Sequence, residues 1–436
     1  MKRFFTTIKN IFSIEDLRVR ILNTIGFLII FRLGSYIVLP GVNPNLLSGT
    51  QGGIFDLLNT FLGGSFSRAS IFALGIMPYI SASIVVQLLT VAVPHFTKLQ
   101  KEGESGRKKL NQITRVLTII ITAAQSYGYI RATVNAEAIL NPGMFFTVSS
   151  IVILIAGTMF CMWLGERITD KGIGNGISML IMIGIVSRFP AAIYQEIDAK
   201  GMNGMLLFIL EALALFFVVV GVIALTQAVR RIPVQYAKQV VGNKLYGGKR
   251  DFIPLKLNSA GVMPIIFAQA LMFIPPLVAQ IWQDSDLGSY VGSTFADFTS
   301  WQYNLLFAIL ILIFTFFYTA ITVPSNDIAD NLKRNGGFVP GIKPGKQTAE
   351  FIDSILSKIT LPGAIFLAAV AILPAFAVKA GITQNFAHFY GGTSLLILVG
   401  VVLDTLQQVE SYLLMRHYEG MMKSGRVKGR SQFAAA

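Results

Sequence analysis

The sequence predicts an all-α membrane protein whose chain crosses the bilayer ten times. Of its 436 residues, 53% are hydrophobic and 13% are charged, where a soluble protein carries about 25% charged residues. The apolar residues come in long charge-free runs, and basic residues gather in every second connection between these runs. Together these observations exclude a soluble globular protein and favour one integral membrane domain.

Ten stretches are long and apolar enough to span the membrane as helices, which takes about 20 residues each. The first follows a basic, amphipathic segment over residues 1–20 without a small-residue cleavage site, so we expect a retained helix and not a signal peptide. The stretches are 21–39, 69–93, 112–130, 145–165, 173–194, 205–229, 258–282, 303–323, 359–378 and 391–415.

The distribution of positive charge tests this count, because cytoplasmic loops carry an excess of Lys and Arg. Thirty of the 36 basic residues lie in 1–20, 94–115, 166–171, 230–256, 327–358 and 416–436. The alternate connections hold Arg68, Arg131, Arg188, Lys200 and Lys379, and Arg32 lies inside the first stretch. We therefore expect both termini in the cytoplasm, the second as a basic tail over 416–436.

Ten spans divide into two sets of five, at 21–195 and 196–415. Because five is odd, homologous halves would face opposite sides of the membrane, as in several transporters. The two halves show no repeat that can be aligned by eye. Pseudo-symmetry is therefore a hypothesis from the count alone.

A short apolar segment, 54–62, lies between the first two stretches with paired glycines on both sides. Nine helical residues are too short to cross a hydrocarbon core of about 30 Å. The segment can be an interfacial helix at the outer leaflet. It can equally be a small movable stopper, since paired glycines permit hinge-like backbone angles.

Prolines interrupt two of the predicted spans. Pro78 lies in the second stretch, and Pro264 and the pair Pro275 and Pro276 lie in the seventh. Each should break the helical hydrogen-bond ladder inside the membrane. The breaks can be static kinks or the mobile walls of a cavity.

Charged groups that could couple an ion gradient to transport are scarce. Arg32, Arg188, Glu211 and Asp404 are the only charges well inside the predicted spans, and most lie near an end. Since each charge at mid-bilayer costs about 3 kcal/mol or more, their scarcity argues against a proton- or sodium-coupled pump.

Cofactor and metal chemistry find little support in the residue pattern. A single cysteine, Cys161, excludes a disulfide framework and a thiolate metal site, and three scattered histidines argue against a metal enzyme. The glycine-rich segments 103–106 and 172–178 complete no nucleotide fingerprint and indicate tight loops or helix packing. We expect no cofactor and no metal.

The connections 230–256 and 327–358 are too long and too basic for simple connectors. The first has seven basic residues against one acidic residue, interleaved with Tyr236 and Tyr246. This composition suits phosphate backbones or an acidic protein partner. Cytoplasmic location alone would also explain the charge, but the length favours docking.

Six blocks resemble the SecY family of protein-conducting channels, and the resemblance extends over essentially the whole chain. The blocks occur in family order. They are RASIFALGIMPYISASI (68–84), KEGESGRKK (101–109), GTMFCMWLGERIT (157–169), GIGNGIS (172–178), ADNLKRNGGFVPGIKPGKQT (329–348) and GGTSLLI (391–397).

The resemblance implies two pseudo-symmetric five-helix halves around a central pore with an apolar ring at its waist. Isoleucines at helical spacing would by themselves indicate ordinary packing. The positions matching the ring are Ile76, Ile80, Ile177, Ile181, Ile266 and Ile397. The residues matching the family's plug, within the wider segment 52–66, are Ile54, Phe55, Asp56, Leu57, Leu58, Asn59, Thr60, Phe61 and Leu62.

The resemblance also implies a lateral gate and a docking surface. Gln87, Gln125 and Asn258 match polar positions lining the gate. The loop residues matching surfaces for the ribosome and the SecA motor are Arg230, Arg231, Lys238, Lys244, Lys249, Arg250, Lys333, Arg334, Lys343 and Lys346. Lys343 departs from the arginine common in bacterial members and so lacks the planar guanidinium fork. The tip at 244–250 departs from the family pattern too.

The function implied by the resemblance is translocation without covalent chemistry. Unfolded secretory polypeptides would pass outward, and membrane segments and signal sequences would leave sideways into lipid. Energy would come from a SecA-like ATPase, the ribosome with its ribosomal RNA, or the membrane potential. SecE-like and SecG-like subunits would complete the complex in a bacterial plasma membrane. The alternatives are an ion-coupled solute transporter and a membrane scaffold that only docks partners.

Overall fold

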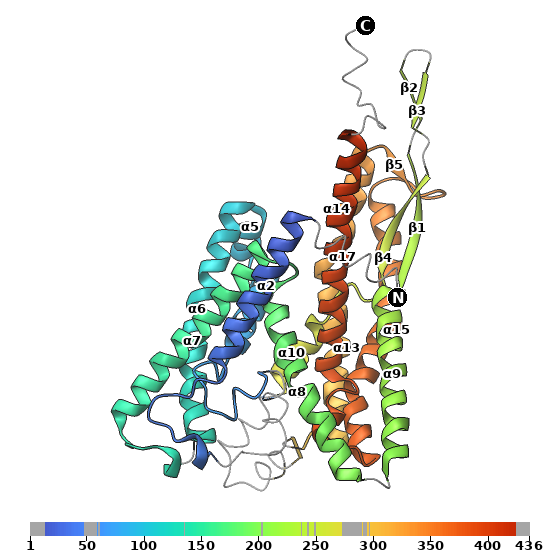
Figure 1. Cartoon of the computed structure of the whole chain (residues 1–436). Helices are drawn as coiled ribbons and strands as arrows, with labels where there is room; N and C mark the ends of the chain where they lie inside the picture. The colour runs from blue at the N-terminus through green and yellow to red at the C-terminus, as the bar shows by residue number, and fades with distance from the viewer. Residues whose placement is uncertain are drawn as a thin grey trace. The chain divides into compact units, whose positions relative to one another are not determined.

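The computed structural model describes residues 14–47, 59, 62–134, 136–201, 204–236, 238–241, 244–247, 250–272, 290, 294–295 and 297–423. The chain is predominantly helical and divides into two compact units (Figure 1). Unit 1 comprises Met1–Arg188 and Val401–Ala436, and unit 2 comprises Phe189–Gly400. Two helices, α8 (Gly176–Lys200) and α17 (Gly392–Lys423), contribute residues to both units.

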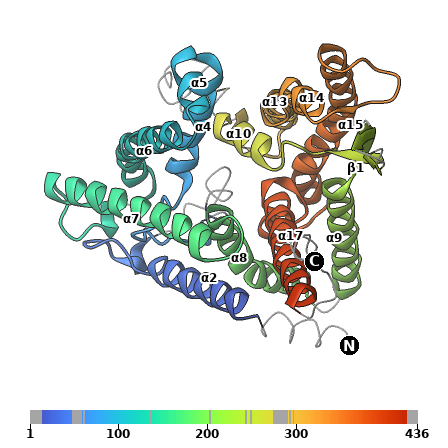
Figure 2. The same cartoon turned by 90° about the horizontal axis from the view of Figure 1, so that it is seen from above.

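Unit 1 is a set of packed helices. Seen from above, α7 lies between α6 and α2 (Figure 2), and it contacts both of them. The unit contains α2 (Glu15–Gly34), the 3-10 turns η1 (Pro44–Leu46) and η2 (Ala136–Ala138), α4 (Met77–Ala92), α5 (Pro94–Lys101), α6 (Glu104–Thr133), α7 (Met144–Lys171) and parts of α8 and α17.

Unit 2 combines helices with a small sheet. Its longest helix, α15, packs along α13, and α13 also packs against α10. The unit contains α9 (Met205–Gln227), α10 (Met263–Leu271), α13 (Trp301–Thr322), α14 (Ser325–Arg334), α15 (Lys346–Lys379), α16 (Gln384–Ala387), and the strands β1 (Val229–Tyr236), β2 (Lys238–Val241), β3 (Lys244–Gly247), β4 (Arg250–Lys256) and β5 (Gly337–Phe338).

Each of the ten predicted stretches contains a described helix. Within the described residues, six helical segments are apolar and long enough to cross a membrane, and α4 with α5, bent by 99°, could form a seventh. Helix α2 carries several charges, and α6 carries a polar stripe that includes Thr118, Thr122 and Ser126. That stripe is buried inside the unit, whereas apolar residues on other faces of α6, such as Val116 and Ile120, are exposed. The count of ten spans stays a prediction.

The prediction that Pro78 and Pro264 break helices inside their spans was wrong. Both prolines lie in the first two positions of a helix, α4 and α10 respectively. A proline is favourable there, because its missing N–H would have no intrahelical acceptor. The preceding part of the second stretch, residues 69–76, forms turns and not helix. The pair Pro275 and Pro276 lies outside the described residues.

The two proline-led helix starts share sequence and backbone conformation. Gly75 at φ 51° begins GIMPYI, and Gly261 at φ 64° begins GVMPII. A second pair follows in the same order, GISMLIMIG at 176–184 and GTSLLILVG at 392–400. The matches relate the second predicted span to the seventh and the fifth to the tenth. They supply the internal repeat that the whole-chain comparison by eye did not show.

The connection 230–256 forms a hairpin, which the sequence analysis did not predict. Strand β1 pairs antiparallel with β4, and its end at Gln235 and Tyr236 pairs with β5 from the connection 327–358. The inner face carries Ile232 and Val234, which pack on Ile352 of α15. The two long connections are therefore parts of one folded body in unit 2.

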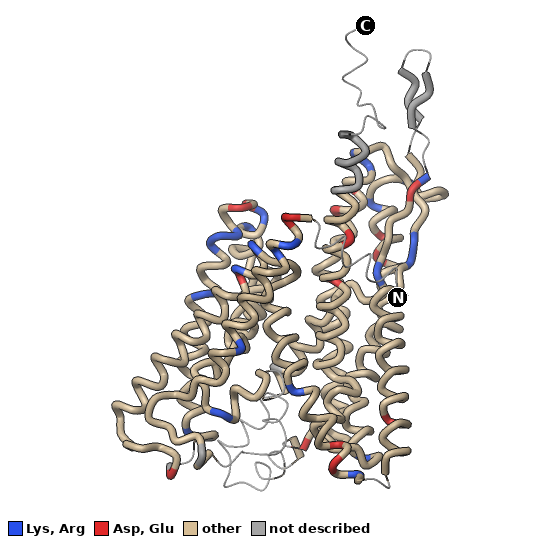
Figure 3. The backbone as a smooth tube through the Cα atoms, in the orientation of Figure 1, with Lys and Arg blue, Asp and Glu red and all other residues tan. Residues whose placement is uncertain are grey.

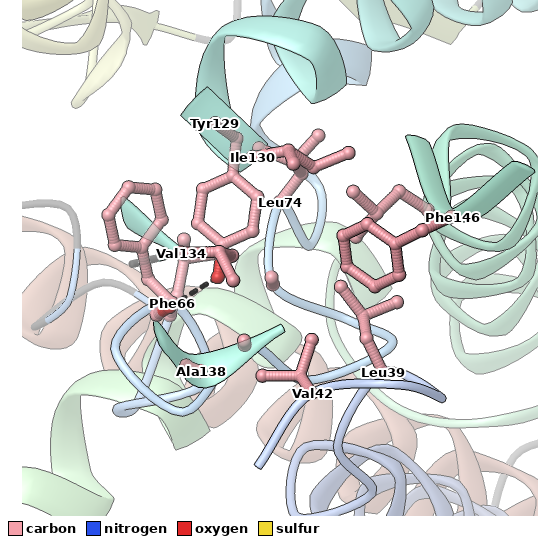
Figure 4. Packing of buried hydrophobic residues seen from close by; sticks show 13 residues of the cluster. Leu39, Val42, Phe66, Leu74, Tyr129, Ile130, Val134, Ala138 and Phe146 are labelled. Atoms are coloured by element: carbon pink, nitrogen blue, oxygen red, sulfur yellow. Dashed lines mark hydrogen bonds between the residues drawn. The ribbon is translucent and has the colours of Figure 1, made fainter. Parts of the chain in front are cut away.

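A buried cluster in unit 1 surrounds the turn segment 62–76 (Figure 4). Tyr129 on α6 donates a hydrogen bond of 2.6 Å to the carbonyl of Phe66, and the two rings meet edge to face at 4.7 Å. Backbone hydrogen bonds tie the segment to the chain after α2, from Leu39 to Ala69 and from Ile71 to Ile37. The segment is therefore fixed on several sides without helical structure of its own.

Candidate functional site

The start of α4 places two predicted ring residues one turn apart. Ile76 occupies the N-cap position, and the Ile80 amide donates to its carbonyl at 3.0 Å. Ile76 is buried in an apolar cluster with Phe31, Phe72 and Leu180. Ile80 packs against the same cluster while remaining half-buried.

The start of α8 brings a third ring residue to this cluster. Asn175 caps the helix, because its Oδ1 accepts from the amides of Ile177 (3.1 Å) and Ser178 (3.3 Å). The helix crosses α7 closely at Gly176, where an added methyl would lie 1.9 Å from the carbonyl oxygen of Gly165. Ile177 is thereby held against the cluster, and Ile181 is half-buried one turn further along.

In unit 2 the remaining two ring residues come from neighbouring helices. Ile266 is half-buried in the first turn of α10, and Ile397 is buried on α17. Thr393 of α17 donates to the side-chain oxygen of Gln269 on α10 at 3.3 Å. An added methyl at Gly391 would lie 2.3 Å from the Val370 carbonyl, so α17 also lies close to α15.

The ring positions follow the internal repeat. Ile80 matches Ile266 in the first repeated block, and Ile181 matches Ile397 in the second. Each unit thus carries predicted ring isoleucines near the starts of two helices, and these starts are equivalent in sequence between the units. The closed ring of six, which would combine both units, stays a prediction.

Two residues of the predicted plug belong to the described chain, and both are buried in unit 1. Asn59 accepts from the Gly64 amide (2.9 Å) through its carbonyl and from the Ser67 amide (3.2 Å) through Oδ1. Leu62 packs so closely on Gly75 that an added methyl there would lie 2.5 Å from Leu62 Cδ2. The end of the segment therefore touches the turn that leads into Ile76.

The other predicted plug residues lie outside the described residues. They are Ile54, Phe55, Asp56, Leu57, Leu58, Thr60 and Phe61.

The predicted gate residues occupy different environments. Gln87 lies half-buried on α4, and Gln125 lies exposed on α6. Asn258 is buried in the turn before α10, and its Oδ1 has no hydrogen-bond partner within the described residues. Hydrogen bonds across the seam would join the two units and stay a prediction.

Most of the predicted docking residues lie around a folded core in unit 2. In unit 1, Lys and Arg gather around α5 and the adjoining end of α6 (Figure 3). In unit 2, the sheet and α15 enclose an apolar cluster that includes Ile232, Leu255 and Leu356. The exposed basic side chains around it are Arg230, Arg231, Arg250, Lys333, Arg334, Lys343 and Lys346.

Helix α15 holds the tip that carries Lys343. Thr348 in its first turn donates from Oγ1 to the Lys343 carbonyl at 2.9 Å. Lys238 and Lys244 lie in the paired strands β2 and β3, and Lys249 lies outside the described residues. Of the predicted docking residues, Lys238 and Lys244 therefore belong to paired strands, and the Lys343 carbonyl is held by α15.

A buried ion cluster in unit 2 was missed by the sequence analysis. Lys200 at the end of α8 lies 3.0 Å from Glu196 and also pairs with Glu211 of α9. The Thr383 amide donates to Glu196 Oε2 at 2.8 Å, and the Thr383 hydroxyl donates to the same oxygen. The Tyr390 hydroxyl donates to the Glu211 carbonyl. The spacing of four between Glu196 and Lys200 was the available signal.

The charges predicted inside the spans therefore differ in their surroundings. Glu211 is paired, Asp404 is exposed, and Arg32 donates to the Gly63 carbonyl. No group of three or more His, Cys, Asp or Glu side chains that could hold a metal occurs in the part of the chain that the structure describes. Cys161 is fully buried in the cluster around Ile76.

Comparison with known proteins gives one consistent result. The SecY family model matches residues 70–406. The protein translocase subunit SecY of Halalkalibacterium halodurans is 45% identical over 432 residues, covering 96% of this chain and 100% of the relative. Two solved structures share the fold, each covering 90% of this chain and 92% of the other. The first is a protein-conducting channel, with a TM-score of 0.63 and 17% sequence identity. The second is Sec61 in a canine ribosome-channel complex, with a TM-score of 0.59 and 16% sequence identity.

Proposed function

The chain belongs to the SecY family, and we propose that it is the pore-forming subunit of a protein translocase. In this role it conducts unfolded secretory polypeptides across the membrane and releases transmembrane segments sideways into lipid. The observation that carries the proposal is 45% identity to a protein translocase subunit over nearly the full length of both chains.

We assign the constriction of the pore to the six isoleucines of the predicted ring. An apolar constriction loses its water and blocks ions at rest. Branched aliphatic side chains also close around a passing polypeptide without binding particular residues of it. The burial of Ile76, Ile80 and Ile177 against one cluster supports this role, because a constriction needs side chains held from behind.

We assign the seal of the resting pore to the plug segment 54–62. The packing of Leu62 against Gly75, next to Ile76, supports a plug whose end is anchored beside the constriction. Its displacement would open the pore, and the paired glycines 52–53 and 63–64 would permit the movement.

We further propose that Gln87, Gln125 and Asn258 line the lateral gate. The buried Asn258 Oδ1, which lacks a partner within the described residues, supports this proposal because a buried polar atom usually has one. Interhelical hydrogen bonds in a membrane contribute only about 1 kcal/mol each. Such a bond holds a gate shut at rest yet yields to an apolar segment that partitions into lipid.

The protein performs no covalent chemistry in this proposal, so partners supply the energy. The exposed basic residues around the sheet would receive the ribosome, including its RNA, and a SecA-like motor. Lys343 at the tip before α15 would serve the motor. SecE-like and SecG-like subunits would complete the complex in a bacterial plasma membrane, with both termini cytoplasmic.

Disulfide crosslinking to a stalled secretory chain tests the conducting role. Cys161→Ala gives a cysteine-free background, and Ile80→Cys or Ile181→Cys is then combined with one cysteine in the stalled chain. The exposed Val85 on α4 and Val186 on α8 provide cysteine controls on the same two helices. We expect crosslinks at the ring positions and none at the controls.

The outcomes separate the proposal from its rivals. A stalled chain that binds the complex without crosslinking at either ring position would favour a docking scaffold. Saturable uptake of a small solute by the purified protein in vesicles would instead favour an ion-coupled transporter.

A further inference from the structure

The turn between α7 and α8 is buried although it has no regular structure. It comprises residues 172–175, of which Gly172, Ile173 and Gly174 are buried. Backbone amides and carbonyls in such a place need hydrogen-bond partners. The side chains that supply them come from α2 and α17, which are far from the turn in the sequence.

Arg20 of α2 holds the end of α7. Its Nη1 donates to the carbonyl of Gly172 at 3.1 Å and to that of Asp170 at 3.4 Å. The last carbonyls of a helix have no partner within the helix, and a positive charge beside them is favourable. The same guanidinium lies 5.4 Å from the centre of the Tyr412 ring on α17. Arg20 therefore links the turn to both α2 and α17.

Two further residues of α2 bind the same stretch of backbone. Asn23 donates from Nδ2 to the Lys171 carbonyl at 3.2 Å, and the buried Thr24 hydroxyl accepts from the Ile173 amide at 3.0 Å. An added methyl at Gly172 would lie 2.4 Å from Thr24 Oγ1. Helix α2 is therefore in direct contact with the turn and leaves no room for a side chain at its first residue.

Gln408 of α17 binds the next amide of the turn. The Gly174 amide donates to Gln408 Oε1 at 2.8 Å, and both residues belong to unit 1. Gly174 has a φ of 81°, and an added methyl would lie 3.0 Å from Thr405 Oγ1. A buried residue of the turn thus depends for its hydrogen bond on a side chain 234 residues away in the sequence.

The turn leads directly into the predicted ring residues of α8. The Gly176 amide, at the helix start, donates to the Thr169 hydroxyl of α7 at 2.9 Å. Ile177 lies three residues after Gly174, and Ile181 lies one helical turn further along α8. A displacement of the turn therefore reaches both isoleucines through a few residues of helix.

We propose that Arg20 and Gln408 are positioning residues that hold the α7–α8 turn between α2 and α17 and thereby keep Ile177 and Ile181 at the constriction. Both residues act through the turn and need no contact with the translocating chain. The proposal rests on the role assigned above to the isoleucine ring. It adds to that role the distant side chains that set the place of two ring residues.

Resting halide flux through the full-length protein in vesicles is the first measurement. Gln408→Leu removes the acceptor of the Gly174 amide, and loss of one neutral hydrogen bond shifts an equilibrium by about fivefold. We expect the flux to rise by a similar factor, because displaced isoleucines let water and ions enter an apolar constriction. Gln408→Glu keeps an acceptor oxygen and should leave the flux unchanged. A flux as high in Gln408→Glu as in Gln408→Leu would refute the proposal.

Each positioning residue has a matched control on its own helix. Arg18→Gln removes the same charge from α2 as Arg20→Gln, and Gln407→Leu changes the exposed neighbour of Gln408. We expect Arg20→Gln to raise the flux and both controls to leave it unchanged. An equal rise in Arg18→Gln would show that loss of positive charge, and not loss of the contact with the turn, opens the pore. The role of Arg20 would then be refuted.

Hydrogen exchange over residues 176–184 shows whether α8 itself is affected. We expect these amides to exchange several-fold faster in Gln408→Leu and Arg20→Gln than in the unmodified protein or the controls. A higher flux without faster exchange would place the leak outside α8 and would refute the positioning role.

Ile181→Asp separates this proposal from the role of the ring. If Ile181→Asp leaves the flux unchanged, the ring assignment fails and the positioning role fails with it. If Ile181→Asp raises the flux but Gln408→Leu and Arg20→Gln do not, the ring assignment stands and the positioning role alone is refuted.

Discussion

Ile80 and Ile266 occupy equivalent positions at two helix starts. Each lies two residues after the proline in the second position of its helix, and each block opens with a glycine of positive φ, Gly75 or Gly261. Ile181 and Ile397 are related in the same way in the second repeated block. Four of the six isoleucines assigned to the ring therefore lie at equivalent positions of two sequence blocks, each of which occurs once in either half of the chain.

A charge introduced at either of these equivalent positions should raise the resting ion flux to a similar extent. Ile80→Asp and Ile266→Asp are each expected to raise resting ion flux several-fold, because a carboxylate hydrates an apolar constriction. Flux through vesicles measures this, with Val85→Asp on the exposed side of α4 as the control. An effect at Ile80 with none at Ile266 would contradict the equivalence.

Close packing at Gly157 should be essential for unit 1. An added methyl there would lie 2.1 Å from the carbonyl oxygen of Ile71, in the turn segment 62–76. Gly157→Ala is expected to lower the free energy of unfolding by about 1 to 3 kcal/mol through overpacking. Gly128→Ala on α6 meets nothing within 4 Å and should stabilise its helix by about 1 kcal/mol. Thermal unfolding in detergent compares the two.

The hydrogen bond from Tyr129 should stabilise the same segment. Tyr129→Phe removes the donor to the buried Phe66 carbonyl and is expected to cost about 1 kcal/mol of stability. Tyr127→Phe changes an exposed tyrosine on the same helix and should have no measurable effect. Equal melting temperatures for the two variants would mean that the hydrogen bond contributes nothing.

The buried ion pair of α8 should matter far more than an exposed pair of identical spacing. Glu196→Gln leaves Lys200 without one of its two partners and weakens the contact to Thr383, so we expect a loss of about 3 kcal/mol. Glu350→Gln breaks the exposed pair with Lys346 on α15 and should cost less than about 1 kcal/mol. Chemical unfolding of both variants provides the comparison, and similar losses would contradict it.

Lys343 should act on motor-driven export more than on ribosome binding. Lys343→Glu reverses an exposed charge without touching the hydrogen bond that Thr348 makes to the Lys343 carbonyl. We expect export driven by a SecA-like motor to fall several-fold, ribosome affinity to change little, and Lys343→Arg to export normally. An equal loss of both activities would show that the tip had collapsed.

Two features that the sequence predictions missed, the start of α4 and strand β1, do have a local signal in the sequence. Pro78 reads as a break when the whole stretch 69–93 is treated as one helix, yet Gly75 at φ 51° shows that the helix begins only after it. Ile232 and Val234 are two residues apart and are flanked by Arg231 and Gln235, and this spacing has the period of a strand. This pattern lies inside the connection 230–256, which was interpreted only as a basic loop because of its seven Lys and Arg residues.

Other features had no local signal. Arg32 and Gly63 are 31 residues apart, and nothing in either neighbourhood indicates that a guanidinium meets that carbonyl. Glu196 and Thr383 are 187 residues apart. Such contacts arise from the packing of whole helices, which composition and periodicity do not encode.

The sequence by itself determined the class of the protein, the approximate positions of its helices and its family, because runs of about 20 apolar residues and long specific motifs need no tertiary information to be recognised. The tertiary structure decided where each helix begins, that two long basic connections contribute strands to one sheet, and that Arg32 and Arg68 both donate to the Gly63 carbonyl. The reason is physical. The hydrophobicity of a stretch is the sum over its consecutive residues, so it can be read from the sequence. A hydrogen bond or a close glycine contact between distant segments exists only once the chain has folded.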